Sequence, residues 1–169
     1  MEPLTDKRAE IQQIKRVVQQ AVDQYPRLIG FLITLPNRVQ NTVQLFQNTV
    51  YQLLNDLVVT RQMSGKQVSP TILRWVWEAP PAQVCRGLLL MNQDTFCHPR
   101  HDIFVDCIET IEVLLHKARR IINRTQLDIT PRISLYRVDR TRPEQSDTQY
   151  THLQNCAFSL LPAVTALRL

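Results

Sequence analysis

The chain contains few glycines and none of the glycine-rich motifs that hold nucleotides. Only three of its 169 residues are glycine: Gly30, Gly65 and Gly87. Phosphate-binding loops, dinucleotide-binding turns and propeller blades need glycine where the backbone takes a positive φ or closely approaches a ligand. The composition therefore argues against all three classes of protein.

The chain also lacks a long hydrophobic run. The longest one extends from Leu28 to Leu35, is interrupted by Thr34 and ends before Pro36. As a helix it would cover about 12 Å, whereas the hydrocarbon core of a bilayer is about 30 Å thick. The first ten residues are rich in charge, and no apolar segment of the kind found in signal peptides follows them. We therefore expect no signal peptide or transmembrane segment, and an intracellular, reducing compartment (cytoplasm or nucleus).

Motifs for metal binding and nucleophilic catalysis are also missing. The four cysteines form no CxxC pair, and no GxSxG sequence is present. In a reducing compartment free thiols are expected. A set of soft ligands for zinc can still be drawn from the segment around Cys97-His98-Pro99-Arg100-His101, and it comprises Cys85, Cys97, His101 and Cys107. Because free cysteine is often buried without any metal, we favour core thiols and expect no metal, cofactor or catalytic residue.

Apolar residues recur at helical spacing in three long segments. Repeats of three and four residues mark one face of an amphipathic helix, and they predict helices over 5–25, 38–61 and 98–123. The last of these has acidic residues in its first half and basic residues near its end, which suits the helix dipole. Shorter apolar segments predict short helices or helical turns over 27–35, 70–77 and 82–91, a loop over 92–96 and a last helix over 145–161.

Residues 130–143 differ in character from the rest of the chain. They contain two prolines and roughly alternate polar with apolar residues, which predicts either an extended arm or one short strand. The sequence therefore predicts an all-α fold, a compact helical bundle of about five to six helices, two or three of them long, with an extended basic arm near the C-terminus. We expect a single domain, in which 1–129 form the bundle core and 130–169 form the arm and a C-terminal helix packed on it.

Basic residues concentrate between His116 and Arg142. This segment holds eight Lys or Arg and two Asp, a net charge of +6, against +5 for the whole chain. Arginine suits phosphate, and Tyr136 stands between arginines where it could stack on a base. One hypothesis is therefore a basic nucleic-acid-binding protein, with Arg119, Arg120, Arg124, Arg132, Arg137 and Arg140 as phosphate contacts. The alternative is that these arginines pair with acidic residues of the same domain.

Two tryptophans and an apolar tail favour a different function. Trp75 and Trp77 differ by about 200° around a helix, so one of them can reach a partner, unless both are buried between helices. The C-terminal tail is hard to bury in a small bundle. Our leading hypothesis is a non-enzymatic protein–protein interaction module, a structural or assembly subunit of a cellular or viral complex. It would bind other subunits or copies of itself through Trp75, Trp77, Tyr136, Val164, Leu167 and Leu169.

Overall fold

Four strands and five helices make up the described part of the chain. The computed structural model describes residues 4–36, 41–78, 84–122 and 133–161. Along the chain the elements are α1 (Leu4–Gln24), β1 (Arg27–Pro36), α2 (Thr42–Met63), β2 (Arg74–Trp77), β3 (Val84–Asn92), α3 (Gln93–Phe96), α4 (Phe104–Ile122), β4 (Ser134–Asp139) and α5 (Pro143–Phe158). The strands form one antiparallel sheet in the order β2-β3-β1-β4.

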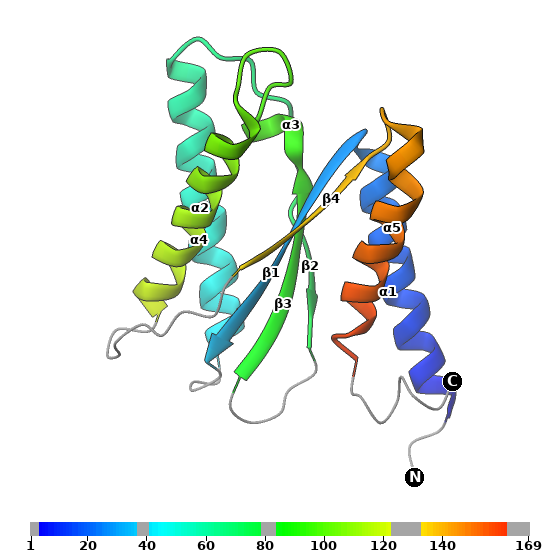
Figure 1. Cartoon of the computed structure of the whole chain (residues 1–169). Helices are drawn as coiled ribbons and strands as arrows, with labels where there is room; N and C mark the ends of the chain where they lie inside the picture. Colours follow the sequence, from blue (N-terminus) through cyan, green and yellow to red (C-terminus); the bar gives the residue numbers. More distant parts are fainter. Residues whose placement is uncertain (1–3, 37–40, 79–83, 123–132, 162–169) are drawn as a thin grey trace.

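The helices cover both faces of this sheet. Helices α2 and α4 lie on one face, and α1 and α5 lie on the other (Figure 1). The fold is therefore a three-layer α/β/α sandwich. Among the described helices, none is both long enough and apolar enough to cross a membrane.

The sheet shows that the all-α prediction was wrong. Segments 27–35, 70–77 and 82–91, predicted as short helices, contain all of β2 and all but the last residue of β1 and of β3. An antiparallel strand with one face in water alternates apolar and polar residues, but β1 and β3 lie at the centre of a sheet covered on both faces. They consequently carry nearly continuous apolar runs, which periodicity alone cannot distinguish from short buried helices. The one-turn helix α3 likewise replaces most of the loop predicted over 92–96.

Two apolar cores lie on the two faces of the sheet. On one side Ile29, Phe31 and Ile33 of β1 pack with Phe46 of α2 and Leu115 of α4. On the other side, β1 and β3 contribute Leu28, Leu88 and Leu90, which pack with Val18 and Ala21 of α1 and with Leu153 and Ala157 of α5. Successive residues of a strand point to opposite faces, so each central strand contributes to both cores.

The long helices were predicted correctly, with shifted ends. Helices α1, α2 and α4 occupy most of 5–25, 38–61 and 98–123, and α5 begins two residues before the segment expected to be the last helix and ends three residues before the end of that segment. Helix α4 begins at Phe104 rather than at His98, because residues 98–102 form a turn in which the backbone N–H of Asp102 donates to the carbonyl of His98 at 3.0 Å. Residues 134–139 form β4, which pairs with β1, so the extended arm was wrong for this segment. The short strand given as its alternative is present, but it belongs to the sheet and does not lie on a helical bundle.

Gly87 of β3 makes room for the ring of Trp77. The two residues are direct partners in the β2–β3 ladder, and a Cβ built on Gly87 would lie 2.2 Å from the indole. The ring therefore lies directly over the glycine backbone.

We expect Gly87→Ala to destabilise the protein by about 1–3 kcal/mol, because the added methyl group must displace a rigid, packed ring. Urea unfolding of the single variant, of Trp77→Leu and of the double variant measures this. The alanine should cost much less in the Trp77→Leu background than in the wild-type background. Equal costs in both backgrounds would contradict the packing described.

Candidate functional site

Strand β2 lies at one end of the sheet, and its outer edge pairs with no other strand in the described part of the chain. Its inner edge pairs with β3, and the backbone N–H of Glu78 donates to the carbonyl of Arg86 at 2.9 Å. In an antiparallel ladder the bonding groups alternate along the strand, so Arg74, Val76 and Glu78 bond inward. The backbone groups of Trp75 and Trp77 consequently point outward, and they form no hydrogen bond with another described residue.

The two tryptophans form one stacked pair. Because β2 is a strand, residues two apart share a face, and the rings stack at 5.3 Å between centroids with an angle of 13°. Both rings pack edge-on against Phe46 of α2, at 5.9 and 6.2 Å. The expectation that they point to different surfaces assumed a helix, and it was wrong for that reason. Both are half-buried, and the indole Nε1 of Trp77 is buried without a hydrogen-bond partner in the described structure.

A groove runs beside this outer edge. It has a volume of about 230 Å³ and lies between α1, β2 and the residues after α5. Its lining comprises Glu10, Gln13, Ile14, Val17, Trp75, Val76, Trp77, Leu160 and Leu161. Mostly apolar side chains therefore border a strand edge whose backbone groups are unpaired in the described structure.

Most residues of the groove lie in the part of the chain that matches a family model. The model of a family described as "Uncharacterised conserved protein UCP030791" matches residues 4–131. The chain belongs to this family. The match contains every residue of the groove except Leu160 and Leu161, and it ends before β4 and α5. No curated protein and no solved structure matches the chain.

The other residues proposed for partner binding lie away from this edge. Tyr136 is in β4, at the opposite side of the sheet, and packs half-buried against the core beneath α1 and α5. A hydrogen bond with the Cys156 side chain, together with burial, raises the pKa of Tyr136. Val164, Leu167 and Leu169 lie outside the described residues.

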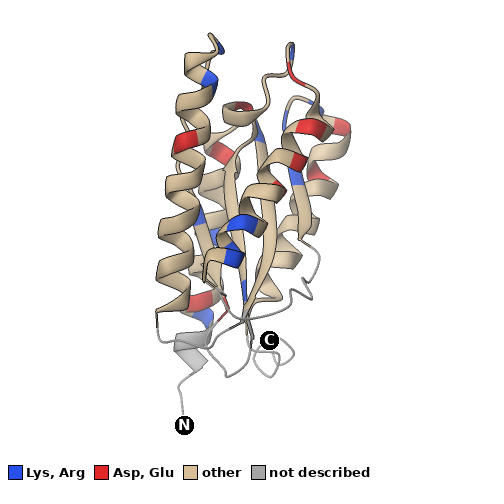
Figure 2. Cartoon of the chain, turned by 90° about the vertical axis from the view of Figure 1, so that its left-hand side faces the viewer, with Lys and Arg blue, Asp and Glu red and all other residues tan. Residues whose placement is uncertain are grey.

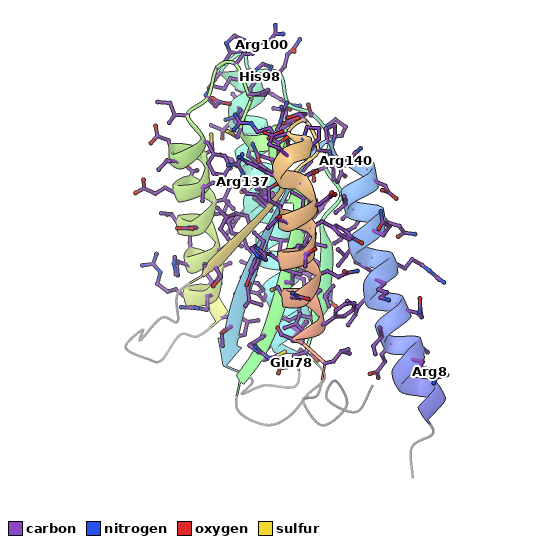
Figure 3. All side chains as sticks on the ribbon, turned by 45° about the vertical axis from the view of Figure 1, so that its right-hand side comes forward. Arg8, Glu78, His98, Arg100, Arg137 and Arg140 are labelled. Carbon is purple, nitrogen blue, oxygen red and sulfur yellow. The ribbon has the colours of Figure 1, made fainter. Side chains whose placement is uncertain are left out.

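Three of the described arginines of the nucleic-acid hypothesis make contacts within the chain. Arg119 is 3% exposed and donates to the carbonyl of Thr34 at 3.2 Å. Arg137 lies 3.8 Å from the centre of the Phe104 ring, and Arg140 donates to the carbonyl of Asp23 (Figure 3). Arg120 is exposed, and Arg124 and Arg132 lie outside the described residues. On the side of the molecule that carries α2 and α4, basic and acidic residues are interspersed (Figure 2).

The structure brings Cys97 and Cys107 of the zinc hypothesis together, but not all four of its residues. Cys85 lies near the start of β3, and Cys97 follows its far end, after a strand length of about 24 Å. Burial and the neighbouring Cys107 thiol raise the pKa of Cys97 to about 12, which disfavours the thiolate that binds zinc. His101 stacks on His98 at 4.6 Å. No group of three His, Cys, Asp or Glu side chains suited to a metal ion occurs in the described ranges.

One buried carboxylate, which the sequence pattern did not reveal, joins three segments. The Asp102 side chain is 6% exposed and accepts hydrogen bonds from Arg61 at 2.6 Å, from Lys66 at 3.0 Å and from the backbone N–H of His98 at 2.7 Å. Asp102 precedes α4 and lies in the turn formed by residues 98–102. Burial by itself would raise the pKa of Asp102, but the hydrogen bonds from these donors outweigh it and lower that pKa.

Replacing this carboxylate should destabilise the fold. We expect Asp102→Asn to cost about 2–3 kcal/mol, because it leaves the Arg61 guanidinium with a weaker, neutral partner. Asp106→Asn, on the exposed first turn of α4, is the matched control and should cost less than about 1 kcal/mol.

The loss of stability caused by Asp102→Asn should depend on pH. The lowered pKa means that the contribution of Asp102 is complete above the unfolded-state pKa of about 3.9 and is lost as the pH falls below it. Urea unfolding between pH 7 and pH 2.5 should therefore show the wild type approaching Asp102→Asn below about pH 4. A difference in unfolding free energy between the two proteins that stays constant down to pH 2.5 would contradict the hydrogen bonds described for Asp102.

Proposed function

We propose that this protein is a binding module that takes up an extended segment of a partner protein as an additional strand beside β2. The observation that carries the proposal is the outward-facing backbone of Trp75 and Trp77 directly beside an apolar groove. An extended peptide can pair with such an edge through its main chain and gain specificity from pockets for alternate side chains.

The surroundings of β2 provide places for those side chains. An added strand would direct alternate residues to the two sides of the sheet. On the side of α1 and α5 the groove offers Ile14, Val17 and Leu160 to apolar residues. The rings of Trp75 and Trp77 lie on the other side of the sheet, where they pack against Phe46 of α2. We therefore propose a segment in which every second residue, the one that faces the groove, is apolar.

The charge distribution favours this function over nucleic-acid binding. Arg119, Arg137 and Arg140 make contacts within the chain, and none of the three lines the groove. Nucleic-acid affinity arises mainly from exposed basic groups that neutralise phosphates together. The lining of the groove is consistent with a binding role without catalysis. Among its described residues, Glu10 carries a carboxylate and Gln13 an amide, and the other seven are apolar or tryptophan.

We place this binding in a reducing compartment inside the cell. Four cysteines are free in the structure, and Cys85, Cys97 and Cys156 are buried. Burial raises the pKa of Cys85 and of Cys156, which keeps their thiols protonated. Unpaired thiols of this kind are usual where glutathione and thioredoxin keep cysteine reduced.

A pair of neighbouring glutamines on α1 tests the proposal. Gln13 lines the groove, whereas Gln12 lies outside it, and both are exposed. Nine-residue peptides selected from a displayed random library are the probes. Gln13→Trp should weaken their binding about tenfold or more by filling the groove, and Gln12→Trp should leave it unchanged, as measured by calorimetry.

N-methylation of the selected peptides tests the strand pairing itself. Methyl groups on alternate peptide nitrogens should abolish binding, while those on the intervening nitrogens should have little effect, since only every second N–H faces β2. If no selected peptide responds to Gln13→Trp, or if the methylation scan shows no alternation, the proposal is wrong.

A further inference from the structure

A second hollow lies on the other side of the molecule. It lies between α2, the segment that leads into β2, and α3, and it has a volume of about 330 Å³. Its lining comprises Tyr51, Leu54, Asn55, Val58, Gln62, Val68, Ser69, Pro70, Thr71, Leu73, Thr95 and Phe96. None of these residues lines the groove beside β2, so this pocket is separate from the proposed peptide site.

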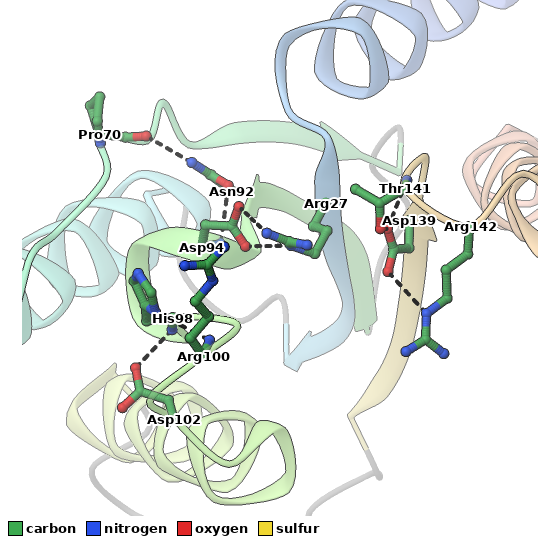
Figure 4. A network of polar contacts seen from close by, with 10 residues as sticks. All are labelled: Arg27, Pro70, Asn92, Asp94, His98, Arg100, Asp102, Asp139, Thr141 and Arg142. Atoms are coloured by element: carbon green, nitrogen blue, oxygen red, sulfur yellow. Dashed lines mark hydrogen bonds and ion pairs between the residues drawn. The ribbon is translucent and has the colours of Figure 1, made fainter.

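Hydrogen bonds hold the walls of this pocket in place. Asn92, at the end of β3, donates its side-chain N–H to the carbonyl of Pro70 at 3.1 Å (Figure 4). It also donates its backbone N–H to Thr71 Oγ1 at 2.9 Å. Its side-chain oxygen accepts from the backbone N–H of Asp94 at 3.1 Å, and Asp94 forms two hydrogen bonds with Arg27. The segment 69–71 and helix α3 are thereby fixed to the central sheet.

The chemistry of the lining points to a neutral ligand. Six lining residues are apolar: Leu54, Val58, Val68, Pro70, Leu73 and Phe96. The other six carry a hydroxyl or an amide: Tyr51, Asn55, Gln62, Ser69, Thr71 and Thr95. No described residue of the lining is charged, so a charged ligand would lose its hydration without gaining a counterion from these residues. Small-molecule sites commonly combine an apolar lining with a few polar groups in this way.

Thr95 provides a second, independent indication of a ligand. The residue is only 1% exposed, and its buried hydroxyl has no hydrogen-bond partner in the described structure. Buried hydroxyl groups are nearly always hydrogen-bonded, because leaving one unpaired costs free energy. A ligand that occupies the pocket can supply the missing partner.

We propose that this pocket binds a small neutral molecule with an apolar body and one hydroxyl or amide group, which forms a hydrogen bond with Thr95 Oγ1. The volume corresponds to roughly ten non-hydrogen atoms, since a water molecule takes about 30 Å³. The binding site is independent of the strand-pairing edge, and either can exist without the other.

Methyl-detected NMR with three neutral probes tests this site. The probes are 2-phenylethanol, 2-(4-hydroxyphenyl)ethanol and benzamide, and the anion phenylacetate is the charged control. At probe concentrations of about 10 mM, at least one neutral probe should shift the methyl signals of Leu54, Val58 and Val68 and leave those of Ile14 and Leu160 in place. Phenylacetate should shift none of them.

Three variants separate ligand binding from folding. Thr95→Val should weaken binding about three- to tenfold without lowering the thermal stability of the free protein, and Thr95→Ser should retain binding. Asn55→Trp, at an exposed position that lines the pocket, should block binding, whereas Gln52→Trp, exposed outside the pocket, should not. The proposal is overturned if no neutral probe shifts these methyl signals, if phenylacetate binds equally well, or if Thr95→Val leaves the affinity unchanged.

Discussion

The burial of β1 and β3 on both faces is the constraint on which the rest of the structure depends. Ile29, Phe31 and Ile33 point to one side of β1, while Leu28 points to the other, and all four are at most 1% exposed. A sheet with two apolar faces needs a cover on each, which requires at least two layers of helices. The division of the long helices into the pairs α2–α4 and α1–α5 follows from this requirement (Figure 1).

In this arrangement strand pairing stops at the two ends of the described sheet, which are β2 and β4. Natural proteins limit unwanted pairing by keeping edge strands short, and β2 has only four residues. A short edge forms few main-chain hydrogen bonds, so binding there depends on the side chains beside it. Here the stacked tryptophans, with Gly87 beneath Trp77, and the residues of α1 shape that surrounding surface. The edge is thereby suited to a selected partner segment rather than to indiscriminate pairing.

The sequence predicted the helices far better than the sheet. The long helices carry one apolar stripe each, as with Ile108, Ile111 and Leu115 in α4, and such a stripe identifies a helix without knowledge of its neighbours. The strands β1 and β3 owe their apolar runs to helices that cover them from distant parts of the chain. Trp75 and Trp77 could be singled out from the sequence, but their stacking required the strand. Asp102 and Thr95 gave no signal in the sequence, because their importance comes from Arg61 and from a pocket wall assembled by tertiary contacts.

Amide hydrogen exchange of β2 in the free protein, followed by NMR, tests the central claim most directly. The claim is that the outer edge of β2 is open. The N–H of Val76 bonds to β3, whereas those of Trp75 and Trp77 face outward, so these two amides should exchange at least about a hundredfold faster than that of Val76. Equal protection of all three amides would show that the edge is already paired, and would contradict the account.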